Sequence, residues 1–128
     1  MDRLITREDH LELLSKVRTA AQVYPEVTEA VDGFGHTSFR VKNKPFIMLG
    51  ASENGMSCSI KTSPETQSML LQGNVYTRTP YIGQHGWVTV YLSERTDWKE
   101  LKDLIEEAYH RTAPPKLRKL HAERQERT

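Results

Sequence analysis

The sequence predicts an α+β fold, a two-layer sandwich in which an antiparallel sheet of about five strands packs against helices. Two observations predict it. Residues 27–92 contain short segments of alternating apolar and polar residues between turn residues, which is typical of hairpin-connected strands. Segments with apolar residues at helical spacing lie on both sides of this region, and such helices must cover one face of the sheet.

The first predicted helix begins at Thr6, with Asp9 three residues later, where an acidic side chain favours a helix N-terminus. It ends at Tyr24-Pro25, because a residue before proline is pushed out of the helical region. The predicted apolar stripe of this helix consists of Leu11, Leu13, Leu14, Val17, Ala20 and Ala21.

Two turns are expected between the predicted strands. Lys42 to Pro45 contains an asparagine, which tolerates positive φ, and a proline, which has a fixed φ. Glu53-Asn54-Gly55 contains the Asn-Gly pair that suits tight primed turns. In the strand that follows, the period of two places Cys58 on the core face. The predicted strands are residues 27–31, 36–41, 46–49, 56–61 and 87–92.

Two further helices are predicted from their caps. Thr62-Ser63-Pro64-Glu65 combines a hydroxyl cap, a proline at the first helical position and an acidic first turn, so a short helix begins there and ends near Gln72-Gly73. Asp97 caps the last helix, and Pro114-Pro115 stops it. This last helix is expected to bury Leu101, Leu104, Ile105 and Ala108.

The tail from residue 116 carries five Lys or Arg residues and two Glu residues. Two interpretations stay open: it adds non-specific attraction for polyanions, or it is a frayed basic terminus.

Length and composition indicate one domain over residues 1–128. The net charge of +1 is far from that of strongly basic nucleic-acid modules, so a polyanion site must come from local charge asymmetry.

The one cysteine excludes an intramolecular disulfide and favours a cytoplasmic location. No stretch approaches the roughly 20 apolar residues that span a bilayer, so we expect no membrane association. We also expect a monomer rather than an oligomer.

No catalytic, metal or cofactor motif is visible. None of the five histidines is paired at metal-ligand spacing, and the chain lacks a nucleophile elbow, a phosphate loop and a dinucleotide fingerprint. A reactive cysteine needs a nearby cation or helix N-terminus, whereas Cys58 is expected to face the core. The sequence therefore predicts no catalytic residue, no metal ligand, no cofactor and no enzymatic activity.

Five basic residues are candidates for nucleic-acid binding. Three of them, Arg40, Lys42 and Lys44, cluster on one predicted strand and its turn, while Lys61 and Arg78 come from other elements. A basic hairpin tip can follow a nucleic-acid groove with its charges on phosphates. The alternative is a solvated face whose edge lysines discourage pairing between sheets.

Four residues define a second candidate site, a cleft for a small ligand: His36, Tyr81, His85 and Trp87. Both histidines are next to glycine in chain breaks, and Lys61 would join them if the sheet brings the two loops together. The alternative is that the histidines are ordinary loop residues. Tyr81 and Trp87 are also candidate stacking surfaces for bases, although a strand tryptophan is more commonly a core residue.

Several segments together resemble the MmcQ/YjbR family of small bacterial proteins: Gly35 to Val41, Lys44-Pro45-Phe46, Ser59 to Glu65, Gly86 to Val90, and Ala108-Tyr109. The resemblance implies a CyaY-like (frataxin-like) fold and a DNA-binding role through two hairpin wings. By position, these wings would turn at Lys42 to Pro45 and at Ser52 to Gly55. The first turn is basic, whereas the second carries Glu53 and no cation.

Overall fold

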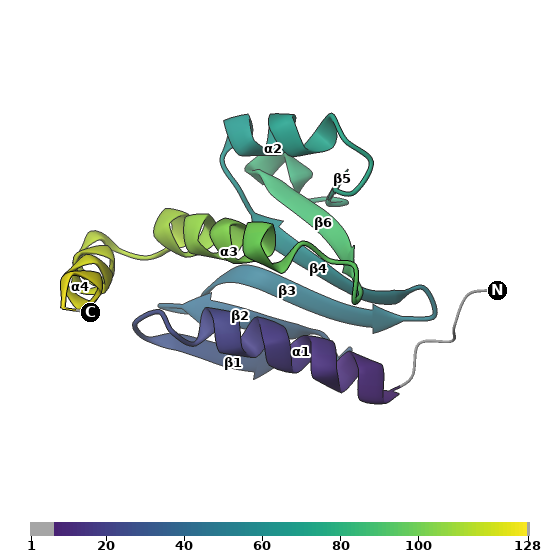
Figure 1. Cartoon of the computed structure of the whole chain (residues 1–128), viewed down its shortest axis with the longest axis horizontal. Helices are drawn as coiled ribbons and strands as arrows, with labels where there is room; N and C mark the ends of the chain where they lie inside the picture. The colour runs from purple at the N-terminus through teal and green to yellow at the C-terminus, as the bar shows by residue number, and fades with distance from the viewer. Residues whose placement is uncertain (1–6, 128) are drawn as a thin grey trace.

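The computed structural model describes residues 7–127, which form one six-stranded antiparallel sheet and four α-helices (Figure 1). The predicted α+β class is confirmed, with six strands rather than about five. In chain order the elements are α1 (Arg7–Ala21), β1 (Val27–Val31), β2 (Thr37–Val41), β3 (Lys44–Ser52), β4 (Gly55–Lys61), α2 (Pro64–Leu71), β5 (Thr77–Arg78), the 3-10 turn η1 (Gly83–His85), β6 (Trp87–Leu92), α3 (Trp98–Thr112) and α4 (Pro115–Glu126). The additional strand is β5, a two-residue edge strand paired with β6.

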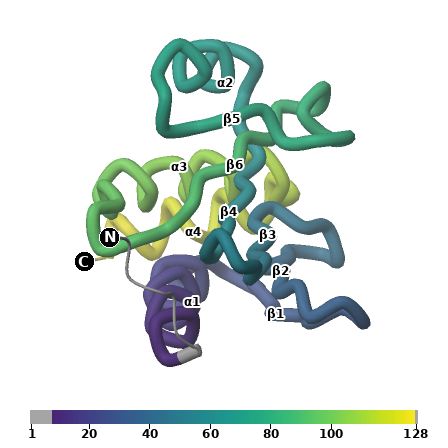
Figure 2. The backbone as a smooth tube through the Cα atoms, turned by 90° about the vertical axis from the view of Figure 1, so that its right-hand side faces the viewer, coloured from purple at the N-terminus to yellow at the C-terminus, as the bar shows by residue number. Residues whose placement is uncertain are grey.

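The sheet has the order β1-β2-β3-β4-β6-β5, and every paired neighbour is antiparallel. α1 and α3 lie on the same face of the sheet (Figures 1 and 2). The core lies between them and alternate residues of the central strands, including Phe39, Ile47 and Ile60. Cys58 is fully buried in β4, which confirms its predicted orientation.

α1 buries Leu13, Val17 and Ala21, with Leu14 and Ala20 partly buried beside them. Leu11 was expected in the same stripe, and this prediction is wrong: its side chain is 53% exposed. At about 100° per residue, position 11 lies roughly 120° from position 17 around the helix axis, outside the buried face. The predicted helix start at Thr6 lies outside the described residues.

The turn between β2 and β3 is tighter than predicted. It consists of Lys42 and Asn43 alone, and their φ values of 49° and 65° have the sign that a type I′ turn requires at both central positions. Pro45 is therefore a strand residue of β3, paired with Arg40, rather than part of the turn. The primed turn expected from Asn54-Gly55 is not formed, because between Ser52 and Gly55 only the glycine has positive φ.

A β-bulge interrupts the pairing of β2 with β3 at Phe39 and Arg40. The extra residue on β3 is Phe46, and both Phe46 and Ile47 are fully buried. Since two residues of a bulged strand oppose one residue of its partner, two successive side chains of β3 can enter the core. The ring of Phe46 packs edge-on against Tyr109 of α3, 5.8 Å between centroids.

The helix caps follow the sequence prediction. The Ser63 hydroxyl accepts a hydrogen bond from the Thr66 amide at 3.0 Å, and the Asp97 carboxylate accepts one from the Glu100 amide at 3.1 Å. α3 buries Leu101, Leu104, Ile105 and Ala108 as expected, and Tyr109 in addition. The tail beyond the two prolines is helical, and α4 buries Leu117 and His121. No helix in residues 7–127 has the length and apolar character to cross a membrane.

Candidate nucleic-acid interface

The β2–β3 turn lies at the end of the sheet where β1 and β6 begin and β4 ends. This region is called the basic end, and it comprises residues 26–28, 40–45, 60–62 and 86–88. Lys61 lies on β4, the strand next to β3, and it pairs with Trp87 of β6. In these segments Glu26 is the one carboxylate, and the cations are Arg40, Lys42, Lys44 and Lys61.

The four cations differ in whether their charged groups already have a partner within the protein. The Arg40 guanidinium donates hydrogen bonds to the Ser38 hydroxyl at 2.9 Å and to the Asn43 carbonyl at 3.2 Å, so it braces the turn. The Lys42 ammonium pairs with the Glu26 carboxylate at 3.0 Å. In the described part of the chain, neither Lys44 nor Lys61 makes an ion pair. The two unpaired ammonium groups are therefore the ones available to an anion without rearrangement.

Arg78 lies at the same end of the sheet but on the edge strand β5, two strands from Lys61. It pairs with Val88 in register, and its side chain packs on Gly83, where a Cβ atom would overlap it. Arg78 is exposed. Thus the structure gathers four of the five predicted cations on adjacent strands and leaves the fifth at the edge of the sheet.

α4 adds cations beside the basic end. The ring of Tyr24 packs on His121 of α4 at 4.9 Å between centroids, and the Tyr109 hydroxyl donates to the Pro25 carbonyl at 2.9 Å. Glu26, the next residue, holds Lys42, so residues 24–26 connect α4 to the β2–β3 turn. Figure 1 shows α4 beyond the end of the sheet at which β3 begins. The exposed cations of this segment are Lys116, Arg118, Lys119, Arg124 and Arg127.

The two turns that correspond to the family's wings lie at opposite ends of the molecule. β3 belongs to both hairpins, so the β2–β3 turn and the β3–β4 turn at Glu53-Asn54 are separated by the length of that strand. The second turn also carries a carboxylate. These two turns therefore do not face one ligand together, and the basic end contains one wing.

The predicted cleft is not assembled around His36. Its ring lies beside Gly50, where a Cβ atom would be 3.3 Å from the His36 Cδ2 atom. Ser57 is the partner of Gly50, and Lys61 is four residues further along β4, roughly 13 Å at the rise of a strand. His36 instead faces Asp32, with 3.4 Å between its Nδ1 atom and the carboxylate. Hydrogen bonds from the backbone amides of His36 and Phe34 hold the pKa of the Asp32 carboxyl below its usual value.

The other members of the predicted cleft differ in their exposure to solvent. Trp87 is only 6% exposed, so it offers no face on which a base can stack. Tyr81 is 93% exposed in a loop and has a φ of 67°. His85 is an exposed residue of η1.

The Lys-Thr-Ser-Pro-Glu segment has a structural explanation. Thr62 is fully buried, and its hydroxyl and its amide donate to the Gly86 carbonyl at 2.7 and 2.9 Å. Ser63 caps α2, and Pro64 begins that helix. This segment connects β4 to α2, and Thr62 ties it to Gly86, the residue before β6.

The sequence patterns did not predict that hydroxyl groups lie together on the face of the sheet opposite α1 and α3. Ser59 and Thr89 lie side by side on this face, with 2.8 Å between their hydroxyl oxygens, and Thr79 lies 2.9 Å from Thr89. Hydroxyl residues at alternate positions of separate strands were the available signal. The strand residues that face this side carry no carboxylate in the described chain. Nor do the described residues contain three His, Cys, Asp or Glu side chains placed to hold a metal ion.

Fold and site together define a small α+β domain whose antiparallel sheet is covered by helices on one face and is basic at one end. The YjbR family model matches residues 23–111, and the chain belongs to this family. The match includes the whole sheet but neither α1 nor α4.

One solved structure with a similar fold is the crystal structure of Deinococcus radiodurans protein DR2400, which contains a DUF419 domain. It superposes with a TM-score of 0.68 at 19% sequence identity, over 75% of each chain. At this identity the similarity establishes the fold. A search of curated proteins finds no match to this sequence.

Proposed function

We propose that the basic end binds DNA with low sequence specificity, and that the chain does so as a cytoplasmic monomer that binds rather than catalyses. The observation that carries the proposal is the register of the sheet, by which Arg40, Lys42, Lys44 and Lys61 lie at one end of the sheet with a single carboxylate. A cluster of cations is the electrostatic requirement for phosphate contact. α4 and the residue that follows it extend the same positive region with five exposed cations.

The types of side chain support low specificity. Lysine ammonium groups act as point charges on phosphates, which position a protein on the duplex without reading bases. The one arginine of the β2–β3 hairpin is engaged with Ser38 and Asn43, so it is not free to make a bidentate contact with guanine. The buried Trp87 adds no stacking surface. Affinity is therefore expected to come from charge.

The test is a titration of a fluorescent mixed-sequence duplex at several salt concentrations. If about three to five phosphates are contacted, log affinity should fall with log salt at a slope near −3 to −5. The Lys44→Ala/Lys61→Ala variant should bind every sequence more weakly, with a slope shallower by about 2. Binding that is indifferent to salt, or unchanged in this variant, would contradict the proposal.

A matched control removes two cations from the other end of the sheet. Arg95 and Lys99 are exposed residues just beyond β6, whose last residue Leu92 pairs with Met56 at that end. Arg95→Ala/Lys99→Ala changes the net charge by the same amount as the test variant, so it separates a local site from a general charge effect. This control should retain at least most of the affinity.

Glu26 provides a test in the opposite direction. Its carboxylate neutralises Lys42 at 3.0 Å on an exposed surface. Glu26→Gln should release that ammonium and strengthen binding by roughly two- to fivefold, which is the size of effect that one exposed charge pair can have. Weaker binding in this variant would show that the wing does not contact the phosphates.

A further inference from the structure

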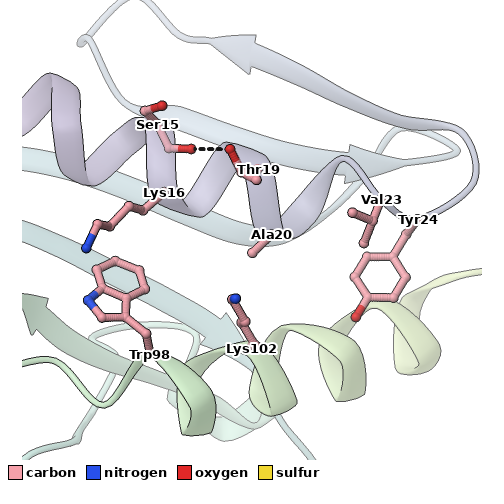
Figure 3. Close-up of a pocket in the computed structure, with 8 residues that line it drawn as sticks. All are labelled: Ser15, Lys16, Thr19, Ala20, Val23, Tyr24, Trp98 and Lys102. Carbon is pink, nitrogen blue, oxygen red and sulfur yellow. Dashed lines mark hydrogen bonds between the residues drawn. The ribbon is translucent and has the colours of Figure 1, made fainter.

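A groove runs between α1 and α3 on the helical face of the molecule, from Lys16 and Trp98 to Tyr24, the residue that packs on α4 (Figure 3). Its volume is about 540 Å³, within the range of roughly 300–1,000 Å³ that is usual for small-molecule sites. The residues that matter for its chemistry are Lys16 and Ala20 of α1, Val23 and Tyr24 of the turn that follows, and Trp98 and Lys102 of α3.

The small Ala20 leaves space between the two helices. Figure 3 shows it facing Lys102, beside the indole of Trp98, and Ala20 and Trp98 both pack against the core. Val23 is 63% exposed and continues the apolar lining toward Tyr24. The lining therefore combines an aromatic side chain with aliphatic ones, and such a surface favours an apolar ligand body.

Two ammonium groups border this apolar surface. The Lys16 ammonium lies over the Trp98 ring, 4.9 Å from its centroid, in a cation–π arrangement. Figure 3 shows the Lys102 ammonium directed from α3 toward Ala20, between the two helices. Among the described residues neither lysine makes an ion pair. Both ammonium groups thus lie toward the Trp98 end of the groove, one on each side of the indole.

The far end of the groove has the opposite character. The Tyr24 hydroxyl lies 3.5 Å from the Glu106 carboxylate, and burial together with this carboxylate raises the pKa of Tyr24 to about 12. A second hollow of about 290 Å³ lies on the other side of Lys16 and is lined by Asp9, Glu12 and Glu94. Like-charge repulsion disfavours an anion at both places, so the lysine end of the groove is the position for one.

We propose that this groove binds a small amphipathic organic anion. The apolar body of the ligand, an aromatic ring or a short aliphatic chain, lies against Trp98 and Ala20. Its carboxylate, sulfonate or phosphate group pairs with Lys102, and the Lys16 ammonium on the other side of the indole adds to the positive potential. This proposal does not depend on the proposed DNA binding, because none of the cations assigned to DNA lines the groove.

The experiment compares three probes that share one body: 4-phenylbutyrate, 4-phenylbutan-1-ol and 4-phenylbutylamine. Binding is followed by NMR through the indole N–H signal of Trp98, assigned with Trp98→Phe, with the Trp87 indole as the internal reference. We expect a saturable shift at Trp98 with the acid at up to about 10 mM, weaker shifts with the alcohol and the weakest with the amine. Equal responses to the three probes, or no saturable shift at Trp98, would overturn the proposal.

Lys16→Gln/Lys102→Gln should weaken 4-phenylbutyrate binding by roughly five- to tenfold, the loss expected when one partly exposed charge pair and the attraction of a second cation are removed. Lys99→Gln is the matched control, because this exposed lysine is adjacent to Trp98 in sequence but does not line the groove. The dispersed amide spectrum of each variant verifies the fold. Unchanged affinity in the double variant would also overturn the proposal. DNA binding should be unaffected by 4-phenylbutyrate, so each of the two proposals can be contradicted without affecting the other.

Discussion

Gly86 has a φ of 94° at the junction between η1 and β6. A Cβ atom at this position would overlap the Thr62 carbonyl oxygen, which belongs to the segment that joins β4 to α2. The Gly86 carbonyl in turn accepts hydrogen bonds from the amide and hydroxyl of the buried Thr62. One glycine thus allows two distant segments to meet without a gap between their backbones.

Gly86→Ala should therefore destabilise the protein by at least about 2 kcal/mol, because it adds left-handed strain and a backbone overlap. Gly33→Ala is the control, since Gly33 has no heavy atom within 4 Å of an added Cβ and no positive φ. Its effect should stay within about 0.5 kcal/mol. Urea unfolding of the two variants measures the difference. Similar stability of both would show that the close approach at Gly86 relaxes at little cost.

At the scale of elements, α4 is attached through few buried residues. In this helix Leu117 and His121 are the buried ones. The His121 Nδ1 atom lies 3.2 Å from the His110 Nε2 atom of α3, and the Tyr24 ring covers the same imidazole. Burial and the neighbouring His110 lower the pKa of His121. The other charged groups that act on it are Glu106, which raises its pKa, and Arg124, which lowers it.

The docking of α4 should weaken in acid. The pKa of His121 is lower in the folded chain than the value of about 6.5 in the unfolded chain. Below about pH 6.5 the unfolded state binds more protons, so this contribution to stability is complete above that pH and is lost as the pH falls through the folded pKa. Amide hydrogen exchange of α4, compared between pH 7.5 and 5, should show lost protection in that helix first.

His121→Phe should remove most of this pH dependence while keeping an aromatic ring against Tyr24. His85→Gln serves as the control, because His85 is exposed in η1. An unaltered pH profile in His121→Phe would assign the effect to another group.

At the scale of the whole molecule, the sheet is anchored by its central strands, and Cys58 lies in the middle of β4 with neighbours on both sides. Burial raises the pKa of its thiol to about 12. The thiolate is the reactive form of cysteine, so the folded molecule protects this side chain both sterically and electrostatically.

Cys58 should react with an aromatic disulfide reagent only when the chain opens globally. We expect negligible labelling in native buffer at neutral pH and a labelling rate that rises with urea in proportion to the unfolded population. Cys58→Ser provides the blank, because the chain has no other cysteine. Rapid labelling under native conditions would mean that β4 opens locally.

Local patterns determined much of the fold from the sequence alone. The caps at Ser63 and Asp97, the strand at Val27–Val31, the inward face of Cys58 and the stop at Pro114-Pro115 all depend on residues a few positions apart. Hydrogen bonds and periodicity at that range belong to the segment itself, so they can be read without knowing its neighbours. The same information placed the basic residues Arg40, Lys42 and Lys44 on one hairpin.

Tertiary structure alone decided which of these segments meet. His36 and Trp87 were expected at one cleft, but antiparallel register sends their loops to different ends of the sheet. The bulge at Phe46, the docking of α4 on Tyr24 and the groove between α1 and α3 likewise arise from packing between residues far apart in the chain. Such contacts are selected by the fit of whole elements against one core, and that fit is not contained in any local stretch of sequence.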